Sequence, residues 1–200
     1  NMGRDAEPVE GILMLYDATG KDHYFQEAER IALDVMRSLS EDHDWRSGHG
    51  VGPYWGVNAL RGTPWNGSHL LAGIAEFLCR ACPDTSPHFN TLLQAARGLV
   101  RTLLAKLRQE YDGFHRAAGA LLPRRHFLVA WLANDAQLIA QIDEAVQRIE
   151  QAYAQQGEAF FKAGHHCAGY LEAPMVFHCL RQTRDTPEAV FAAQASPLST

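Results

Sequence analysis

One repeating pattern limits the folds open to this chain of 200 residues: an apolar helical segment, a short turn, and then a more amphipathic helical segment. The clearest unit is HLLAGIAEFLCRA, the turn PDTSPH, and FNTLLQAARGLVRTLLAKL. Apolar residues at helical spacing predict helices, of which all-round apolar ones are typically buried and amphipathic ones half exposed. The pattern therefore predicts an all-α fold of antiparallel helical hairpins in two layers, an inner and an outer one.

Three further units complete the pattern. The first runs from Val9 through the turn ATGKD to Leu39. Another joins HFLVAWLA to AQLIAQIDEAVQRIEQAYAQ through the turn ND, which we expect to contain an N-cap. The last joins APMVFHCLRQ to AVFAAQ through TRDTPE. We interpret 1–200 as one domain of four such hairpins.

The connections in this pattern are of two lengths. Turns within a hairpin are short, whereas the segments 41–67, 111–125 and 157–169 between hairpins are long. If the hairpins stack in register, all three long segments emerge on one face, where the inner helices begin. Those segments and the residues next to them hold most of the ten histidines and many of the aromatic residues. A long ordered loop that carries aromatic residues more often has a functional role than a purely connecting one. We therefore predict that the functional site lies on this face.

The segment 45–71, WRSGHGVGPYWGVNALRGTPWNGSHLL, is the richest part of that face. Its glycines and prolines are dense enough to argue against a continuous helix. We expect a loop whose glycines allow the backbone to turn tightly over a cup walled by aromatic side chains.

The segments LYDATGKDHYFQEAERIALDVM and PWNGSHLLAGIAEFL resemble the α/α-toroid proteins, of the six-hairpin glycosidase class, and in particular unsaturated glucuronyl hydrolases. The resemblance implies an open or incomplete α/α toroid and a carbohydrate-active enzyme. Four hairpins stand here where a full toroid has six, so the chain is a fragment of a larger toroid, a shortened variant, or half of an oligomeric ring. The paired aspartates of the glucuronyl hydrolases have no clear counterpart.

A fainter resemblance to lanthionine cyclases rests on GHGVGPYWGVNAL and HHCAGYLEAPMVFHCL. It implies zinc held by two cysteines and a histidine, but the chain offers His166–Cys167 in the reverse order and no second cysteine on a comparable segment. Cys79 and Cys82 form a lone C-x-x-C without the second pair that a zinc site needs, so we interpret them as buried thiols. We predict no metal and no cofactor.

Aromatic rings on a concave face suit sugars, because C–H groups stack on the ring while hydroxyl groups reach polar neighbours. The predicted substrate-binding residues lie in or beside the long segments: Arg46, Tyr54, Trp55, Trp65, Asn66 and Tyr170. The alternative is that Trp55 and Trp65 only pack the loop onto the ends of the helices.

Two kinds of catalytic residue are open. Glycoside hydrolysis needs two carboxyl groups, for which Asp112 and Glu172 are the best placed, although one could only form a turn and the other only favour a helix N-terminus. Elimination at a uronate needs a base, an acid and a cation, which His49, His69 and Tyr54 with Arg46 could supply. His166 is a further candidate for proton transfer.

The composition excludes some classes of protein. A net charge of −5 and scattered arginines argue against a nucleic-acid partner, and no apolar stretch is long enough for a membrane span. We expect a carbohydrate-active enzyme, hydrolase or lyase, acting on a saccharide or another small molecule. A non-catalytic helical-repeat module for binding or assembly is the alternative, and a zinc-dependent cyclase a distant third. The sequence favours a cytoplasmic location, leaves a removed leader open, and predicts a homo-oligomer through the terminal hairpins.

Overall fold

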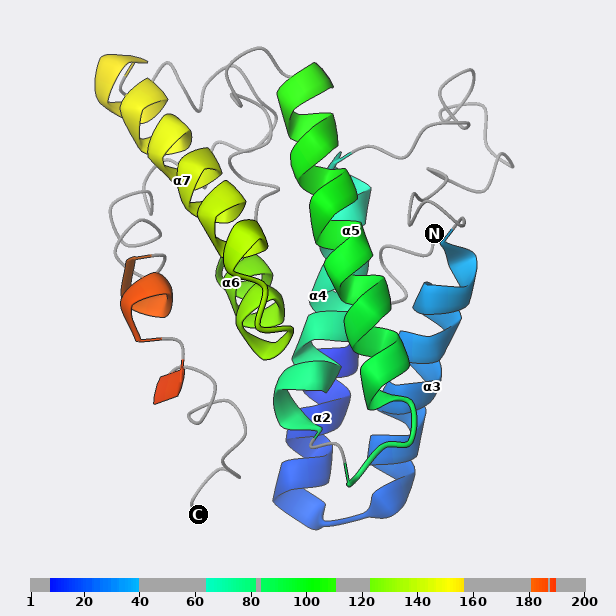
Figure 1. Cartoon of the computed structure of the whole chain (residues 1–200). Coiled ribbons are helices and arrows are strands. Elements are labelled where there is room, and N and C mark those ends of the chain that lie inside the picture. The colour runs from blue at the N-terminus through cyan, green and yellow to red at the C-terminus, as the bar shows by residue number, and fades with distance from the viewer. Residues whose placement is uncertain are drawn as a thin grey trace.

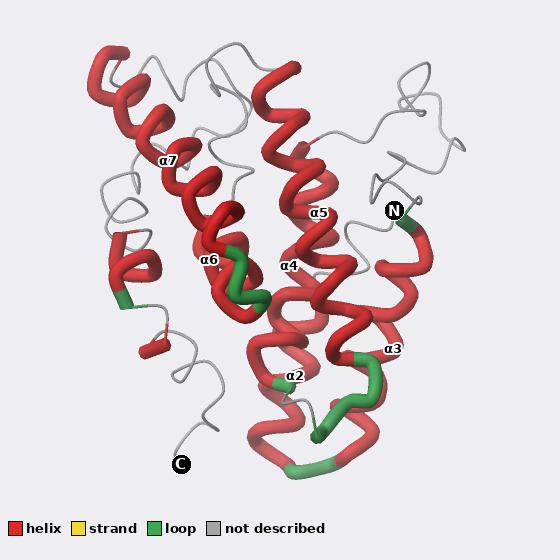
Figure 2. Tube along the Cα trace, viewed as in Figure 1, coloured by secondary structure: helices red, strands yellow, loops and turns green. Residues whose placement is uncertain are grey.

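The computed structural model describes residues 8–39, 64–81, 84–110, 123–156, 181–186 and 188–189. Its described part is helical, with no strand, which confirms the all-α prediction (Figures 1 and 2). Six helices have defined bounds: α2 (Pro8–Thr19), α3 (Asp22–Ser38), α4 (Pro64–Arg80), α5 (Phe89–Glu110), α6 (Pro123–Leu132) and α7 (Ala136–Gln156).

Consecutive helices pack as antiparallel pairs: α2 with α3, α4 with α5, and α6 with α7. Helix α4 also packs on both α2 and α6, and α5 packs on both α3 and α7. Helices α2, α4 and α6 run in one direction and α3, α5 and α7 in the other (Figure 1). The short turns therefore share one end, which we call the turn end. The N-termini of α4 and α6 point toward the opposite end.

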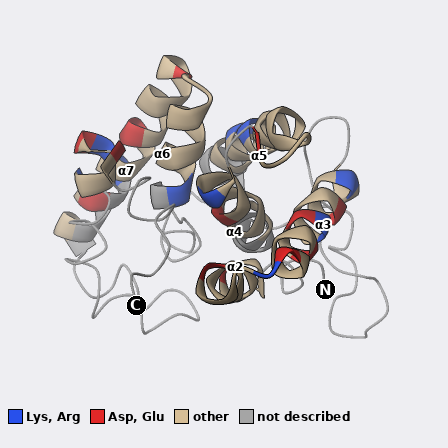
Figure 3. Cartoon of the chain, turned by 90° about the horizontal axis from the view of Figure 1, so that it is seen from below, with Lys and Arg blue, Asp and Glu red and all other residues tan. Residues whose placement is uncertain are grey.

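Helix α4 is the centre of the packing. Seen along the helices, it lies among α2, α3, α5 and α6 (Figure 3), and it packs against each of them. Phe77 is fully buried, and its ring lies 5.2 Å from that of Phe25, which in turn is 5.4 Å from the ring of Tyr16. Burying a side chain of this size contributes about 1.5–3 kcal/mol, so Phe77 is one of the large single contributions of α4 to the core.

Two of the turns form as predicted. In the first, Gly20 has a φ of 63°, a left-handed conformation that glycine adopts without strain, and its N–H donates to the carbonyl of Tyr16 at 2.7 Å. In the turn before α7, Asn134 has a φ of 50°, which asparagine tolerates better than most residues. Asp135 follows and accepts a hydrogen bond from the N–H of Leu138 at 3.0 Å, which confirms the predicted cap.

The predicted starts of two helices were wrong. We expected helices from His69 and His126, but α4 begins at Pro64 and α6 at Pro123. Proline is favoured at the first position of a helix, because its missing N–H would have no partner there and its φ is already helical. The last part of the segment 45–71 is therefore helix rather than loop.

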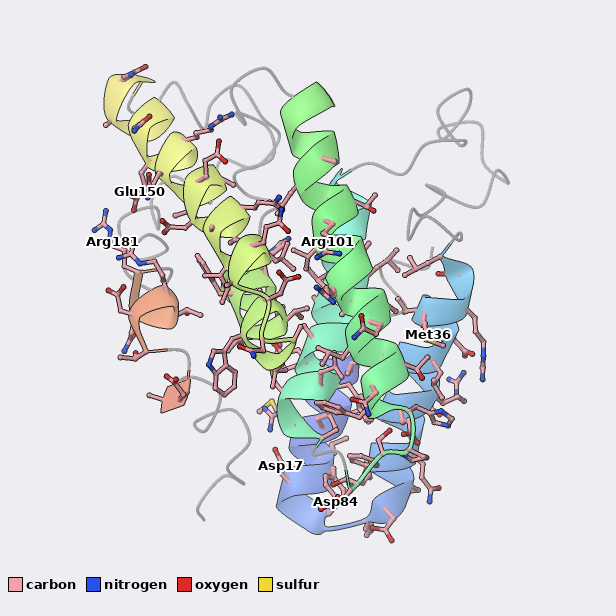
Figure 4. The ribbon with its side chains drawn as sticks, in the orientation of Figure 1. Asp17, Met36, Asp84, Arg101, Glu150 and Arg181 are labelled. Carbon is pink, nitrogen blue, oxygen red and sulfur yellow. The ribbon has the colours of Figure 1, made fainter. Side chains whose placement is uncertain are left out.

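A short helical stretch at 181–185 lies beside α7. Arg181 pairs with Glu150 at 2.8 Å, as Figure 4 shows, and Arg184 pairs with Asp143 at 3.2 Å. Residues 183–185 therefore belong to a helix and not to the predicted turn TRDTPE. Among the described helices, none has the length and apolar character that a membrane span requires.

Candidate functional site

The predicted site residues fall in two groups. Trp65, Asn66 and His69 belong to the first turns of α4. The other predicted residues lie outside the described part of the chain, so the structure does not test whether they come together: Arg46, His49, Tyr54, Trp55, Asp112, His166, Tyr170 and Glu172.

One residue expected on the loop face is elsewhere. His126 comes directly after the long segment 111–125, among the histidines expected on that face, but it lies within α6 and is fully buried. The position is explained by the start of α6 at Pro123, which brings His126 into the first turn and against the core.

A cluster of charged side chains joins α2, α4 and α6. Arg125 of α6 donates from Nε to Oε1 of Glu76 in α4 at 2.8 Å. The Nη2 atom of the same guanidinium lies 3.7 Å from Oε2 of Glu10 in α2. We call Glu10, Glu76 and Arg125 the inner-helix cluster. Only 20% of the Arg125 side chain is exposed.

The two carboxylates of this cluster lie in contrasting surroundings. The side chain of Glu76 is 6% exposed and that of Glu10 is 55% exposed. The Oε2 atom of Glu76 is buried and has no hydrogen-bond partner among the described residues. A buried acceptor without a donor costs about 1–3 kcal/mol. Glu76 is thus a buried carboxyl group with one oxygen held by arginine and one still able to accept a hydrogen bond.

The cluster lies where the two shorter helices begin. Glu10 is in the first turn of α2 and Arg125 in the first turn of α6, whereas Glu76 lies in the second half of the longer α4. Trp65 is eleven residues before Glu76 on α4, which is roughly 16 Å along the helix axis. The predicted aromatic residues of α4 and the cluster are therefore separated by about three helical turns.

The turn end contains a different kind of charged contact. Arg80, at the C-terminus of α4, pairs with Asp17 of α2, and both side chains are largely buried. Asp17 and Asp84 mark this end in Figure 4. Ser86, just before α5, donates a hydrogen bond to Glu29 of α3. These contacts join one helix to the next near the turns.

Asp135 is the other strongly held acid. Its Oδ2 accepts hydrogen bonds from Arg97 at 2.6 Å and Arg101 at 2.8 Å, while Oδ1 accepts the N–H of Leu138. Burial alone would raise the pKa of Asp135, but the Leu138 N–H and the two guanidinium groups outweigh it and hold the pKa below its ordinary value. Arg101, on α5, is labelled in Figure 4. This group fixes α5 to the start of α7.

The sequence reasoning selected candidates from the long segments, and it missed Glu76. One signal was present: Glu76 is the single acid in the apolar run HLLAGIAEFLCRA. A glutamate is almost never fully buried unless it is paired, so such a residue predicts a partner on another helix.

No family model, curated protein or solved structure gives a significant match to this chain. Within the described residues, no three His, Cys, Asp or Glu side chains are grouped so that they could hold a metal ion. Cys79 is buried, as predicted, and Cys82 lies outside the described part of the chain.

Proposed function

We propose that this protein is a carbohydrate-active enzyme, of the glycoside hydrolase or uronate lyase type, whose substrate binds at the end toward which α4 and α6 begin. The observation that carries the proposal is the common direction of α2, α4 and α6. Because these helices run the same way, the segments 41–63 and 111–122, which hold several of the predicted aromatic, acidic and histidine residues, lead into α4 and α6 in the same direction. The finer fold, an open α/α toroid like that of the six-hairpin glycosidases, is part of this proposal.

The inner-helix cluster adds chemistry of the required kind, about three helical turns from Trp65, a separation that a bound oligosaccharide would have to span. A hydrolase needs two carboxyl groups in different surroundings, and Glu76 and Glu10 differ in this way. A lyase needs a cation near the substrate carboxylate, as Arg125 could provide. These residues add to the candidates from the sequence. Hydrolysis would use the acids Asp112 and Glu172, elimination would use His49 and His69, and His166 is a further candidate for proton transfer.

A second function is favoured by a separate observation. Helix α2 exposes Met14 and Leu15 to solvent, which suits a helical-repeat module that assembles with a partner and catalyses nothing. Catalysis distinguishes the two proposals, because an assembly module would bind no sugar and turn over none.

The test is a screen of neutral and uronate-containing oligosaccharides with the full chain. New reducing ends report hydrolysis, and absorbance of an unsaturated product reports elimination. Glu76→Gln should lower turnover by about 100-fold or more if the carboxyl group transfers a proton. Glu29→Gln, which changes a glutamate at the turn end, should leave turnover unchanged.

The tryptophans test sugar binding independently of turnover. Trp55→Ala and Trp65→Ala should each weaken saccharide binding by about 1–2 kcal/mol, because an aromatic contact is lost, while the melting temperature changes little. Trp131→Ala, in α6 and near the turn end, is the control and should leave sugar binding intact. If the tryptophans only pack the fold, each truncation should instead cost about 3–5 kcal/mol of stability. That result, with no oligosaccharide bound by the parent protein, contradicts the proposed function.

A further inference from the structure

Helix α2 has an exposed face that is apolar along its whole length. Gly11, Met14, Leu15 and Ala18 are all exposed, and their spacing of three and four residues places them in one line on the helix. Met14 is 45% exposed and Leu15 is 47% exposed. A Cβ atom built on Gly11 would meet nothing within 4 Å, so the space in front of this position is open. We call these four residues the α2 stripe.

The α2 stripe differs from the outer faces of the neighbouring helices. On α3, Arg30 pairs with Glu27 and with Asp34, and all three side chains are well exposed. On α7, Arg148 pairs with Glu144 in the same way. Within Pro8–Thr19, by contrast, Glu10 is the one charged side chain among the exposed residues. A helix face that only meets water is typically charged, so the α2 stripe has the character of a contact surface.

The order of side chains along the stripe fits a second copy of itself. Read from either end, the stripe is small, large, large, small: Gly11, Met14, Leu15, Ala18. In an antiparallel pair related by a two-fold axis, each residue meets the one at the mirrored position. Gly11 would then lie opposite Ala18 of the second copy and Met14 opposite Leu15. The small residues at both ends allow the two helices to approach closely.

Charge selects the antiparallel orientation over the parallel one. Glu10 lies near the N-terminus of α2, and the exposed Lys21 follows its C-terminus. A parallel pair would bring Glu10 next to Glu10, which is unfavourable. An antiparallel pair brings Glu10 of one copy toward Lys21 of the other.

We propose that the α2 stripe is the contact surface of a symmetric homodimer, in which two α2 helices pack antiparallel across a two-fold axis. A contact of about two helical turns is smaller than the roughly 800 Å² per partner of a standard interface. We therefore expect a weak, reversible dimer and take a dissociation constant on the order of 100 µM as its expected strength. The proposal does not depend on the protein being an enzyme, since none of the four stripe residues belongs to the inner-helix cluster and only the choice of orientation uses Glu10.

The test is sedimentation of the full chain over a range of concentrations. The average mass should rise from 22.2 kDa toward twice that value as the concentration passes about 100 µM. Met14→Lys and Leu15→Glu should each weaken association about tenfold or more, because each places a charge opposite an apolar side chain. Both positions are exposed, so circular dichroism and the melting temperature should match the wild type. Ala140→Lys, on the exposed face of α7, is the control and should associate like the wild type.

Mixing the two variants tests the orientation. In an antiparallel pair, Lys at position 14 of one variant faces Glu at position 15 of the other, so the mixture should associate although each variant alone does not. In a parallel pair the two charges are not opposite each other and the mixture stays monomeric. A wild type that remains at 22.2 kDa up to about 1 mM, single variants that associate like the wild type, or a mixture that remains monomeric would each overturn the proposal.

Discussion

Asp135 and Glu76 are the most buried acids among the described residues, each lies beside arginine, and the two are held in opposite ways. Asp135 is 5% exposed, and both of its carboxylate oxygens accept hydrogen bonds, from two guanidinium groups and one backbone N–H. Glu76 is equally buried, but only Oε1 is held, by Arg125, while Oε2 has no partner among the described residues. A fully satisfied buried acid is what stability requires, whereas a half-satisfied one costs free energy. The difference separates a structural acid from a candidate functional one.

The largest effect is expected at Asp135. In Asp135→Asn, the side-chain oxygen can continue to accept the N–H of Leu138, but its NH₂ group then faces the donors of Arg97 and Arg101. If the side-chain amide adopts the flipped orientation, its NH₂ group faces the N–H of Leu138 and the cap of α7 is lost instead. In either orientation we expect the free energy of unfolding to fall by about 2–3 kcal/mol. Urea unfolding followed by circular dichroism measures this loss.

The matched control is Asp143→Asn, which removes the acid paired with the partly exposed Arg184. An exposed ion pair contributes little, so this variant should lose no more than about 0.5 kcal/mol. Equal losses in the two variants would mean that the hydrogen bonds of Asp135 add nothing beyond an ordinary surface pair.

Acid should remove part of the same stability. Since the pKa of Asp135 is lower in the folded protein than in the unfolded chain, the unfolded state takes up its proton first as the pH falls. The stabilisation is complete above the ordinary aspartate pKa of about 4 and is lost as the pH falls through the lower pKa of the folded state. The difference in stability between wild type and Asp135→Asn should therefore narrow below about pH 4. Urea unfolding at a series of pH values measures it, and a constant difference down to pH 2, on the order of 2 units below that value, would contradict the assignment.

Helix type and the two turns could be predicted because both depend on neighbouring residues. Periodicity predicted α4 as a buried helix, and ND predicted an N-cap, which the structure assigns to Asp135. The sequence also holds a signal for the starts of α4 and α6, since Pro64 and Pro123 occupy the first helical position, which favours proline. The glycines around Trp65, however, argued for a loop. The prolines favour a helix start and the glycines favour a loop, so the local sequence does not fix where these helices begin. Their starts depend on the tertiary packing of each helix.

The inner-helix cluster could not be predicted in the same way. Glu76 and Arg125 are 49 residues apart, and nothing local to either indicates the other. The sequence around Glu76 predicts only that this residue needs a partner, because it is the single acid in an apolar run. Which arginine meets it depends on how far α6 extends along α4, and that follows from the packing of the two helices. The predicted residues outside the described part of the chain remain predictions.

Of the two buried acids, Glu76 should show the smaller effect on stability, and the size of this effect tests whether Glu76 is held less firmly than Asp135. In Glu76→Gln, the side-chain oxygen can continue to accept from Nε of Arg125. The new NH₂ group takes the place of Oε2, where no described donor lies, so no donor is set against another. Arg125 also keeps Glu10 at 3.7 Å, so its charge is not left alone. We therefore expect the free energy of unfolding to change by no more than about 1 kcal/mol, less than for Asp135→Asn.

The same urea measurement applies, and an unchanged dependence on urea would show that the folded state keeps its compactness. A loss as large as that of Asp135→Asn would mean that Oε2 of Glu76, like the oxygens of Asp135, makes a contact that stabilises the fold. Glu76 would then be a structural acid. A small loss of stability together with a large loss of turnover would instead identify Glu76 as a functional acid, in contrast to Asp135. A residue kept for chemistry can be replaced by its amide at little cost to the fold.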